Sequence, residues 1–293
     1  MSGRYPDWAT DGKDWPNRMA SSFVRAGGYE WHVQMMGSGP VCVLIHGTGA
    51  ATHSWRDMMP LLAKQYTVVA MDLPGHGFTK GSGQRPTLEG MATSVAALLD
   101  ELKLAPALVV GHSAGVAIGA QLLLDRKWQI PLIGFTPALM PFPGLAARLF
   151  PQLAKMLFTN PFVSIIFSRM AQAPGQTAKF LARATGSNID TAGAKYYTRL
   201  FSKSGHCDGA IRMMANWRLE NLRDHLSKLT SPTLLIRASQ DSAIPKAAVE
   251  DAAALIPECT LEVMEKLGHL AHEEDPKLAT DIITRFAKKQ GIA

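Results

Sequence analysis

Short apolar runs rich in β-branched residues alternate with longer amphipathic segments along much of the chain. The runs VCVLI (41–45), TVVAM (67–71) and ALVVGH (107–112) each lead into a loop that contains glycine. Between the last two, residues 87–104 carry apolar side chains three and four positions apart, with Thr87 placed to cap the N-terminus, and this spacing predicts a helix. Strands alternating with helices predict a mostly parallel sheet with helices on both faces.

The same alternation returns near the C-terminus. The predicted elements there are a strand at 232–239, a helix at 246–256, a strand at 260–265 and a helix that ends near Lys289. At the other end of the chain, the segments 21–26 and 30–36 alternate polar and apolar residues and are joined at Gly27 and Gly28. We expect these two segments to form a β-hairpin that opens the fold.

Residues 137–224 break this rhythm. Four prolines precede Thr159 in this interval, and helix-like segments rich in Phe, Leu, Met and Ala follow. Proline interrupts helices and central strands alike, so the parallel sheet cannot continue regularly through the interval. We therefore expect residues 1–136 and 225–293 to form one α/β core, and 137–224 to form an inserted helical cap.

Charge is distributed unevenly along the chain. Residues 137–224 hold eleven Lys or Arg and four Asp or Glu, a net charge of +7, whereas the rest of the chain holds nineteen basic and twenty acidic residues. A basic and apolar cap favours an anionic small molecule or the surface of an anionic membrane as its partner. Nucleic acid is not expected, because the chain carries no recognisable nucleic-acid-binding motif.

The cysteines and the other metal-ligating residues do not form a recognisable metal site. Cys42, Cys207 and Cys259 are scattered and form no CxxC pair, which argues against a disulfide framework and against a zinc site. His206, Cys207 and Asp208 are consecutive, and adjacent residues converge poorly on one metal ion. The phosphate-binding pattern G-x-x-x-x-G-K-[ST] is absent from the sequence, so an ATP-driven subunit of the P-loop type is excluded. We predict no metal and no cofactor.

The sequence favours a cytoplasmic protein. Its N-terminal residues are polar and lack the basic start and apolar stretch of a secretory signal. Two uncharged runs, 104–124 and 128–147, approach the length of a membrane-spanning helix, but prolines and glycines within them favour buried core segments. Peripheral contact of the basic cap with the inner membrane surface stays open as an alternative.

The stretch GHSAG, at 111–115, fits the pattern G-x-S-x-G between a predicted strand and a predicted helix. This pattern requires a sharp, strained turn that exposes the serine hydroxyl. The two glycines leave room where a side chain would clash with the neighbouring strand and helix. We expect Ser113 to be a nucleophile, and the alternative is an ordinary strand-to-helix corner.

A serine hydroxyl needs a base, and the base needs an acceptor that fixes its tautomer. His269 follows the last predicted strand, at the sheet edge where Ser113 also lies. His272 is expected at the surface or behind His269. Asp241 follows the preceding strand, which completes a triad in the order Ser113, Asp241, His269. Taken alone, Asp241 is better explained as a turn former before Pro245, and the ordered set of three residues is what favours the catalytic role.

The loop after the first buried strand supplies the remaining component of acyl-transfer chemistry. HGTG, at 46–49, contains two glycines that let backbone N–H groups point inward. We expect the amides of Thr48 and Ala114 to form an oxyanion hole. A plain turn is the alternative explanation of this loop.

These motifs together carry a resemblance to a known family. HGTG, DLPGHG (72–77), GHSAG, Asp241 and the Gly-His pair at 268–269 stand in the order found in α/β-hydrolases, and the chain resembles that family over nearly its whole length. More narrowly, five segments resemble the magnesium-chelatase accessory α/β-hydrolases of bacteriochlorophyll biosynthesis in phototrophic bacteria. They are DWPNR (14–18), WHVQ (31–34), HGTGA (46–50), HSWRD (53–57) and GHSAG (111–115), and the cap segment MMANWRLENL (213–222) is similar too.

The resemblance implies an α/β-hydrolase fold and a place beside magnesium chelatase, but it does not supply a reaction. We predict a serine hydrolase that acts on a small molecule, with a tetrapyrrole or its ester as the candidate suggested by the family. The candidate substrate contacts are His112, Phe142, Phe150 and Phe158, and packing within the cap is the alternative role for these side chains. Two other functions stay open: a non-catalytic tetrapyrrole-binding or chelatase-assisting module, and a general carboxylesterase unrelated to pigment synthesis.

Overall fold

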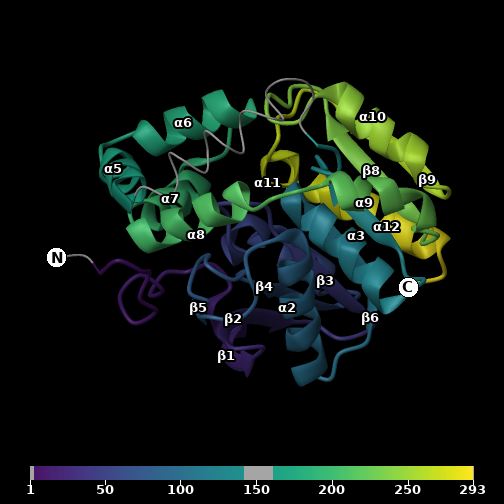
Figure 1. Cartoon of the computed structure of the whole chain (residues 1–293), viewed down its shortest axis with the longest axis horizontal. Coiled ribbons are helices and arrows are strands. Elements are labelled where there is room, and N and C mark those ends of the chain that lie inside the picture. The colour runs from purple at the N-terminus through teal and green to yellow at the C-terminus, as the bar shows by residue number, and fades with distance from the viewer. Residues whose placement is uncertain (1–2, 142–160, 293) are drawn as a thin grey trace.

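A single twisted sheet organises the protein (Figure 1). The computed structural model describes residues 3–141 and 161–292. Within them the sheet has nine strands in the order β1-β2-β4-β3-β6-β7-β8-β9, with β5 paired to β2. The strands are β1 (Ser21–Ala26), β2 (Tyr29–Met36), β3 (Val41–Ile45), β4 (Thr67–Met71), β5 (Lys80–Gly81), β6 (Pro106–His112), β7 (Leu132–Phe135), β8 (Thr233–Ala238) and β9 (Cys259–Met264).

Helices connect the strands and cover the sheet. The α-helices are α1 (Met58–Leu62), α2 (Leu88–Glu101), α3 (Ala114–Arg126), α5 (Pro161–Ala171), α6 (Gln176–Thr185), α7 (Thr191–Phe201), α8 (Ser204–Ala215), α9 (Glu220–His225), α10 (Lys246–Leu255), α11 (Ala271–Glu274) and α12 (Pro276–Lys289). Short 3-10 turns occur at η1 (Arg18–Ala20), η2 (Thr52–Trp55) and η3 (Leu226–Lys228).

The strand directions confirm the predicted architecture. β1 and β2 form the expected antiparallel hairpin, and β2 also pairs antiparallel with β4. From β4 onward the pairs β4–β3, β3–β6, β6–β7, β7–β8 and β8–β9 are all parallel. Between β7 and β8, the described regular structure is helical, from α5 to η3. That helical stretch lies where an inserted cap is predicted, and the exact division into core and cap stays a prediction.

Alternation along each strand sends its side chains into two separate hydrophobic cores. In β3, Val43 and Ile45 enter the core beneath α2 and α3, whereas Cys42 and Leu44 enter the core beneath α1 and α12. All four side chains are fully buried. Burial on both faces explains why β3 reads as a continuous apolar run in the sequence.

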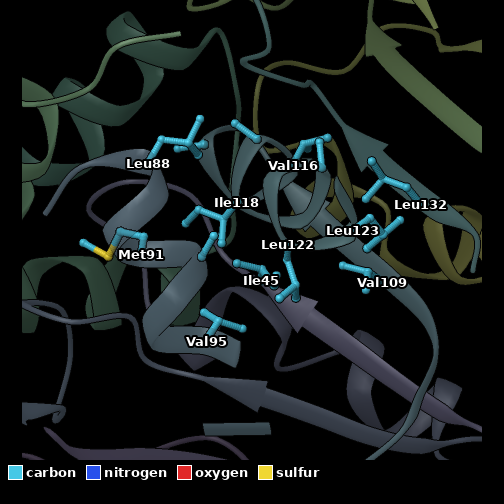
Figure 2. Packing of buried hydrophobic residues seen from close by; sticks show 14 of the residues in the cluster. Ile45, Leu88, Met91, Val95, Val109, Val116, Ile118, Leu122, Leu123 and Leu132 are labelled. Atoms are coloured by element: carbon cyan, nitrogen blue, oxygen red, sulfur yellow. The ribbon is translucent and has the colours of Figure 1, made fainter. Parts of the chain in front are cut away.

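Helix α2 shows why the local sequence folds as predicted. The side chain of Thr87 accepts a hydrogen bond from the amide of Gly90 at 3.1 Å and so caps the first turn. Leu88, Met91 and Val95 follow on one face and pack in the buried cluster that α3 shares (Figure 2). Each such side chain contributes about 1.5–3 kcal/mol when it is fully buried.

Parallel pairing gathers several strand ends at one edge of the sheet. The register aligns Ile45, the last residue of β3, with Gly111 of β6. The loops that begin at His46 and Ser113 are therefore neighbours, and the loops after β8 and β9 leave the same edge. Within the described residues, no helix is long and apolar enough to cross a membrane.

Candidate active site

Ser113 occupies a strained turn between β6 and α3. Its φ of 52° and ψ of −118° lie in a region that residues other than glycine seldom adopt. A Cβ atom at Gly111 would lie 2.6 Å from Cα of Val116, and one at Gly115 would lie 2.1 Å from the carbonyl oxygen of Ile45. The predicted elbow is confirmed, since both glycines are needed for the helix and the neighbouring strand to approach this closely.

His269 and Asp241 form a direct hydrogen bond. Nδ1 of His269 lies 2.9 Å from Oδ2 of Asp241, and both side chains are largely buried. The other carboxylate oxygen, Oδ1, accepts the amides of Ala243 at 2.7 Å and Ile244 at 2.9 Å. Asp241 therefore forms a turn and also bonds the imidazole of His269, and its role in a triad stays a prediction. With Nδ1 donating to the carboxylate, Nε2 of His269 is left as the basic nitrogen.

The elbow and the histidine loop are in direct contact. Nε2 of His112 donates to the carbonyl oxygen of His269 at 3.0 Å, and Oγ1 of Thr136 donates to the same oxygen at 2.8 Å. The rings of His112 and His269 lie 4.8 Å apart, centroid to centroid. Among the described residues, Ser113 Oγ makes no hydrogen bond to His269. In ligand-free enzymes this bond is commonly long and tightens when the substrate binds.

The HGTG loop and the start of α3 each supply one amide next to the elbow, those of Thr48 and Ala114. Among the described residues, the amides of Thr48 and Ala114 donate to no acceptor. Gly47 packs closely on the elbow, because a Cβ there would lie 2.8 Å from Nδ1 of His112 and 3.0 Å from Cβ of Ser113. Ala114 is the first residue of α3, so its amide adds the positive end of a helix dipole. This arrangement suits a developing oxyanion.

The sequence profile of the alpha/beta hydrolase family matches residues 42–281. This chain belongs to that family. The Magnesium-chelatase 30 kDa subunit of Rhodobacter capsulatus is 40% identical over 264 residues, which cover 89% of this α/β-hydrolase and 92% of that protein. The motifs predicted both a resemblance to the α/β-hydrolases and a narrower resemblance to the magnesium-chelatase accessory proteins among them. Both resemblances are confirmed.

A more distant relative of this α/β-hydrolase is named an esterase, and a solved structure with the same fold is named a lactonase. The pimeloyl-[acyl-carrier protein] methyl ester esterase of Aeromonas hydrophila is 27% identical over 280 residues, covering 87% of this chain and 98% of that protein. The solved enol-lactonase from Burkholderia xenovorans LB400 superimposes with a TM-score of 0.75 at 20% identity, covering 91% of this chain and 100% of the other. The structural likeness shows the shared fold.

Two buried histidines hold the HGTG loop of this α/β-hydrolase. Nδ1 of His46 donates to the carbonyl of Gly47 at 2.7 Å, and its Nε2 accepts the amide of Leu73 at 3.0 Å. Nε2 of His206, on α8, donates to the carbonyl of Gly49 at 3.0 Å. Burial lowers the pKa of His46, and it lowers the pKa of His206 to about 4. Both rings are therefore neutral near pH 7 and act as fixed hydrogen-bond partners.

The connection between α6 and α7 holds the loop of His269. The amide of His269 donates to the carbonyl of Thr185 at 2.8 Å, and the amide of Leu270 donates to Oγ of Ser187 at 2.8 Å. A carboxylate bridges the same two segments, because Glu274 accepts the amides of Gly268 and Asn188. Sequence reasoning missed these contacts, and no local pattern identifies their partners.

A buried polar network lies behind the histidine loop. Oε1 of Glu273 accepts Oγ of Ser54 and the hydroxyl of Tyr197, each at 2.7 Å, and Oε2 accepts a guanidinium nitrogen of Arg56 at 3.3 Å. Burial raises the pKa of Glu273 to about 7, although these donors oppose the rise. Since Tyr197 lies on α7, the network joins the inserted helices to the core.

Of the two positions expected for His272, at the surface or behind His269, the structure shows the second. Its side chain is fully buried, its Nε2 donates to Oγ of Ser54 at 2.8 Å, and its ring stacks 4.4 Å from that of His112. Burial lowers the pKa of His272 to about 3. The ring is therefore neutral near pH 7 and packs behind His269, which is one of the two positions expected from the sequence.

The predicted substrate contacts are only partly described. His112 is 3% exposed, and its Nε2 is occupied by the carbonyl of His269. This geometry supports a role in holding the histidine loop rather than in touching a substrate. Phe142, Phe150 and Phe158 lie outside the described residues. Within 3–141 and 161–292, no group of three or more His, Cys, Asp or Glu residues is arranged to hold a metal ion.

Proposed function

We propose that this α/β-hydrolase is a serine hydrolase that cleaves an ester-type bond. Ser113 is the nucleophile, His269 is the base and then the acid, and Asp241 orients the imidazole. The single observation that carries the proposal is the 2.9 Å bond between His269 Nδ1 and Asp241 Oδ2, next to a serine held at a positive φ. A fold that served only for binding would have no need to maintain this strain.

The geometry supports the following sequence of steps. Oγ of Ser113 attacks the carbonyl carbon while its proton passes to Nε2 of His269. The amides of Thr48 and Ala114 donate to the negative oxygen of the tetrahedral intermediate. When the intermediate collapses, the alcohol leaves with the proton from Nε2, and an acyl group stays on Ser113. Water then attacks the acyl-enzyme with the same histidine as base, which releases the acid and restores the serine.

Labelling with a fluorophosphonate tests this proposal directly. The reagent forms a covalent bond only with an activated serine, so the wild-type protein is expected to label stoichiometrically and Ser113→Ala not at all. Ser202→Ala is the matched control, because Ser202 lies on the inserted helical segment and its Oγ donates to the carbonyl of Thr198. Absence of labelling in a folded wild-type protein would leave Ser113 without activation and would overturn the proposal.

A role beside magnesium chelatase in bacteriochlorophyll synthesis is the physiological setting we propose. The observation that favours it is the 40% identity, over 89% of the chain, to a protein named as a magnesium-chelatase subunit. Complementation of a pigment-deficient host that lacks this gene separates the possibilities. Loss of pigment with folded Ser113→Ala supports hydrolytic chemistry in the pathway, whereas full rescue favours a chelatase-assisting module without turnover.

Tetrapyrrole binding is the second candidate function, and it rests on the resemblance of the sequence motifs to the magnesium-chelatase accessory α/β-hydrolases. The chain has six tryptophans, so protoporphyrin binding can be followed by quenching of their fluorescence. Saturable quenching in the micromolar range supports a tetrapyrrole as substrate or ligand. Turnover of simple esters without such quenching supports a general carboxylesterase instead.

A further inference from the structure

Helices α5 and α6 expose large apolar side chains to solvent. Phe162, Ile166 and Met170 stand four residues apart, so they lie along one face of α5, and they are 65%, 58% and 62% exposed. Phe180, on α6, is 44% exposed. Side chains of this size gathered on neighbouring helices form a contiguous apolar surface, which in soluble proteins marks an interaction site.

A cleft between the two helices continues this surface. It has a volume of about 340 Å³, and Met170 and Phe180 line it together with Phe167. Lys179 and Arg183 line the same cleft and are exposed. The surface formed by Phe162, Ile166, Met170, Phe180, Arg169, Lys179 and Arg183 is called the α5–α6 face below.

The cations of the α5–α6 face have no acidic partner. Among the described residues, Arg169, Lys179 and Arg183 form no ion pair, and the sequence from 126 to 189 contains no Asp or Glu at all. Every charged side chain in that stretch is therefore basic. Unneutralised positive charge beside an apolar surface requires an anionic partner that also accepts apolar side chains.

Three basic residues elsewhere in the inserted helical segment do have acidic partners within the protein. Lys195 and Arg199 both pair with Asp14 at 2.7 Å, and Lys203 pairs with Asp11 at 2.7 Å. These acids belong to the N-terminal segment, which packs against α7 and the turn that follows it. Arg169, Lys179 and Arg183 have no such pairing among the described residues, and Figure 1 shows α5 and α6 at the outer end of the helical insertion, away from the sheet.

We propose that the α5–α6 face docks this protein on the surface of a bilayer that contains anionic lipid. The apolar side chains enter the boundary between headgroups and acyl chains, and the three cations contact lipid phosphates. No described helix can span a bilayer, so the attachment is interfacial. An acidic protein would match the charge, but it would leave the row of large apolar side chains on α5 without a complementary environment.

Vesicle partitioning of the full-length protein tests this proposal. Binding is measured by sedimentation with vesicles of phosphatidylcholine alone and of phosphatidylcholine mixed equally with phosphatidylglycerol. Wild-type protein is expected to bind the anionic vesicles and to be released by high salt. Each cation near an anionic surface changes partitioning by about fivefold, so the triple variant R169Q/K179Q/R183Q is expected to bind about 100-fold more weakly.

The matched control removes the same number of charges elsewhere. Lys277, Lys288 and Lys289 are exposed on α12, and the triple variant K277Q/K288Q/K289Q is expected to bind nearly as well as wild type. Ile166→Ser retains all the charges and is expected to bind about tenfold more weakly, because it loses apolar burial. Circular dichroism confirms that each variant is folded.

Three results would each overturn the proposal. The first is no binding of folded wild-type protein to anionic vesicles. The second is that both triple variants bind the anionic vesicles equally weakly, which would mean that binding depends only on the net charge of the protein. The third is unchanged binding by Ile166→Ser, which would place the apolar side chains outside the interface.

Discussion

The amide of His269 donates a hydrogen bond to the carbonyl of Thr185, 2.8 Å away. Thr185 is the last residue of α6, so an inserted helix fixes the backbone of the proposed catalytic base. The next residue, Gly186, has φ +68° and approaches the Asp241 loop, since a Cβ there would lie 2.1 Å from the carbonyl oxygen of Gln240. The same short connection therefore holds both the base and the residue that orients it.

Replacement of Ser187 by alanine is expected to lower kcat on a chromogenic ester by about 10- to 100-fold, with little change in KM. The amide of Leu270 would lose its acceptor, which costs about 1–3 kcal/mol and loosens the loop that carries His269. Ser202→Ala removes a serine hydroxyl of α7's end without touching this loop and is expected to retain wild-type kcat. Equal kcat for Ser187→Ala and wild type would refute this positioning role.

Replacement of Asp241 by asparagine is expected to lower kcat by about 10⁴-fold while the protein stays folded; this size is taken from the equivalent change in chymotrypsin-like proteases. An amide can still accept from Ala243 and Ile244 through its oxygen, so the turn persists. Its NH₂ group cannot accept from Nδ1 of His269, and the imidazole then adopts the wrong tautomer. Steady-state kinetics and the thermal midpoint are measured together. If the thermal midpoint fell strongly, the loss of activity would be explained by disruption of the Asp241 turn rather than by the wrong tautomer of His269.

Removal of Arg56 is expected to destabilise the protein by about 3–5 kcal/mol. Its side chain is 7% exposed and pairs with Glu273 in the core and Asp190 at the start of α7. Arg56→Met leaves the buried carboxylate of Glu273 without its cation, whereas the double variant Arg56→Met/Glu273→Gln removes both. Urea unfolding is expected to show a smaller loss for the double variant than the sum of the two single variants. If the stability loss of the double variant equalled the sum of the two single losses, coupling between Arg56 and Glu273 would be excluded.

Six buried histidines predict steep loss of stability in acid. Burial lowers the pKa of each of them from 6.5 in the folded protein. Below about pH 6.5 the unfolded chain therefore binds protons that the folded chain does not, and stability falls as pH falls. Each histidine contributes about 1.4 kcal/mol per pH unit in that window. The six are His46, His53, His76, His112, His206 and His272.

The raised pKa of Glu273, about 7, acts in the opposite direction between pH 4.5 and about 7, because there the folded state holds the extra proton. One carboxyl group offsets only one histidine. Total stabilities are about 5–15 kcal/mol, so unfolding is expected near pH 5–6. Urea midpoints from about pH 7.5 to 5.5 measure the slope. His53→Gln is expected to reduce the slope by about one proton, because burial lowers the pKa of His53 well below its usual value. If the urea midpoint did not change with pH, the conclusion that these buried histidine rings are neutral in the folded protein would be wrong.

Much of the candidate site could be predicted because its residues follow strand ends. Ser113 and the HGTG loop follow runs whose apolar pattern marks buried parallel strands, and parallel pairing brings their ends to one edge. Asp241 and His269 were placed by the same reasoning, and they form the expected hydrogen bond. For His272 the sequence left two positions open, at the surface or behind His269, because its three-residue spacing from His269 says nothing about which side chains surround it; the structure buries it.

The chain's periodicity by itself determined the order and type of the elements, since a helix or strand buries one face through residues close in sequence. It also determined which strand ends carry reactive side chains. Only the tertiary structure decided what holds those side chains in place. Ser187 and Leu270 are 83 positions apart, and Ser54 and Glu273 are 219 apart. Such partners meet because buried polar groups must be satisfied by whatever packs against them, and that depends on the folded arrangement of distant segments.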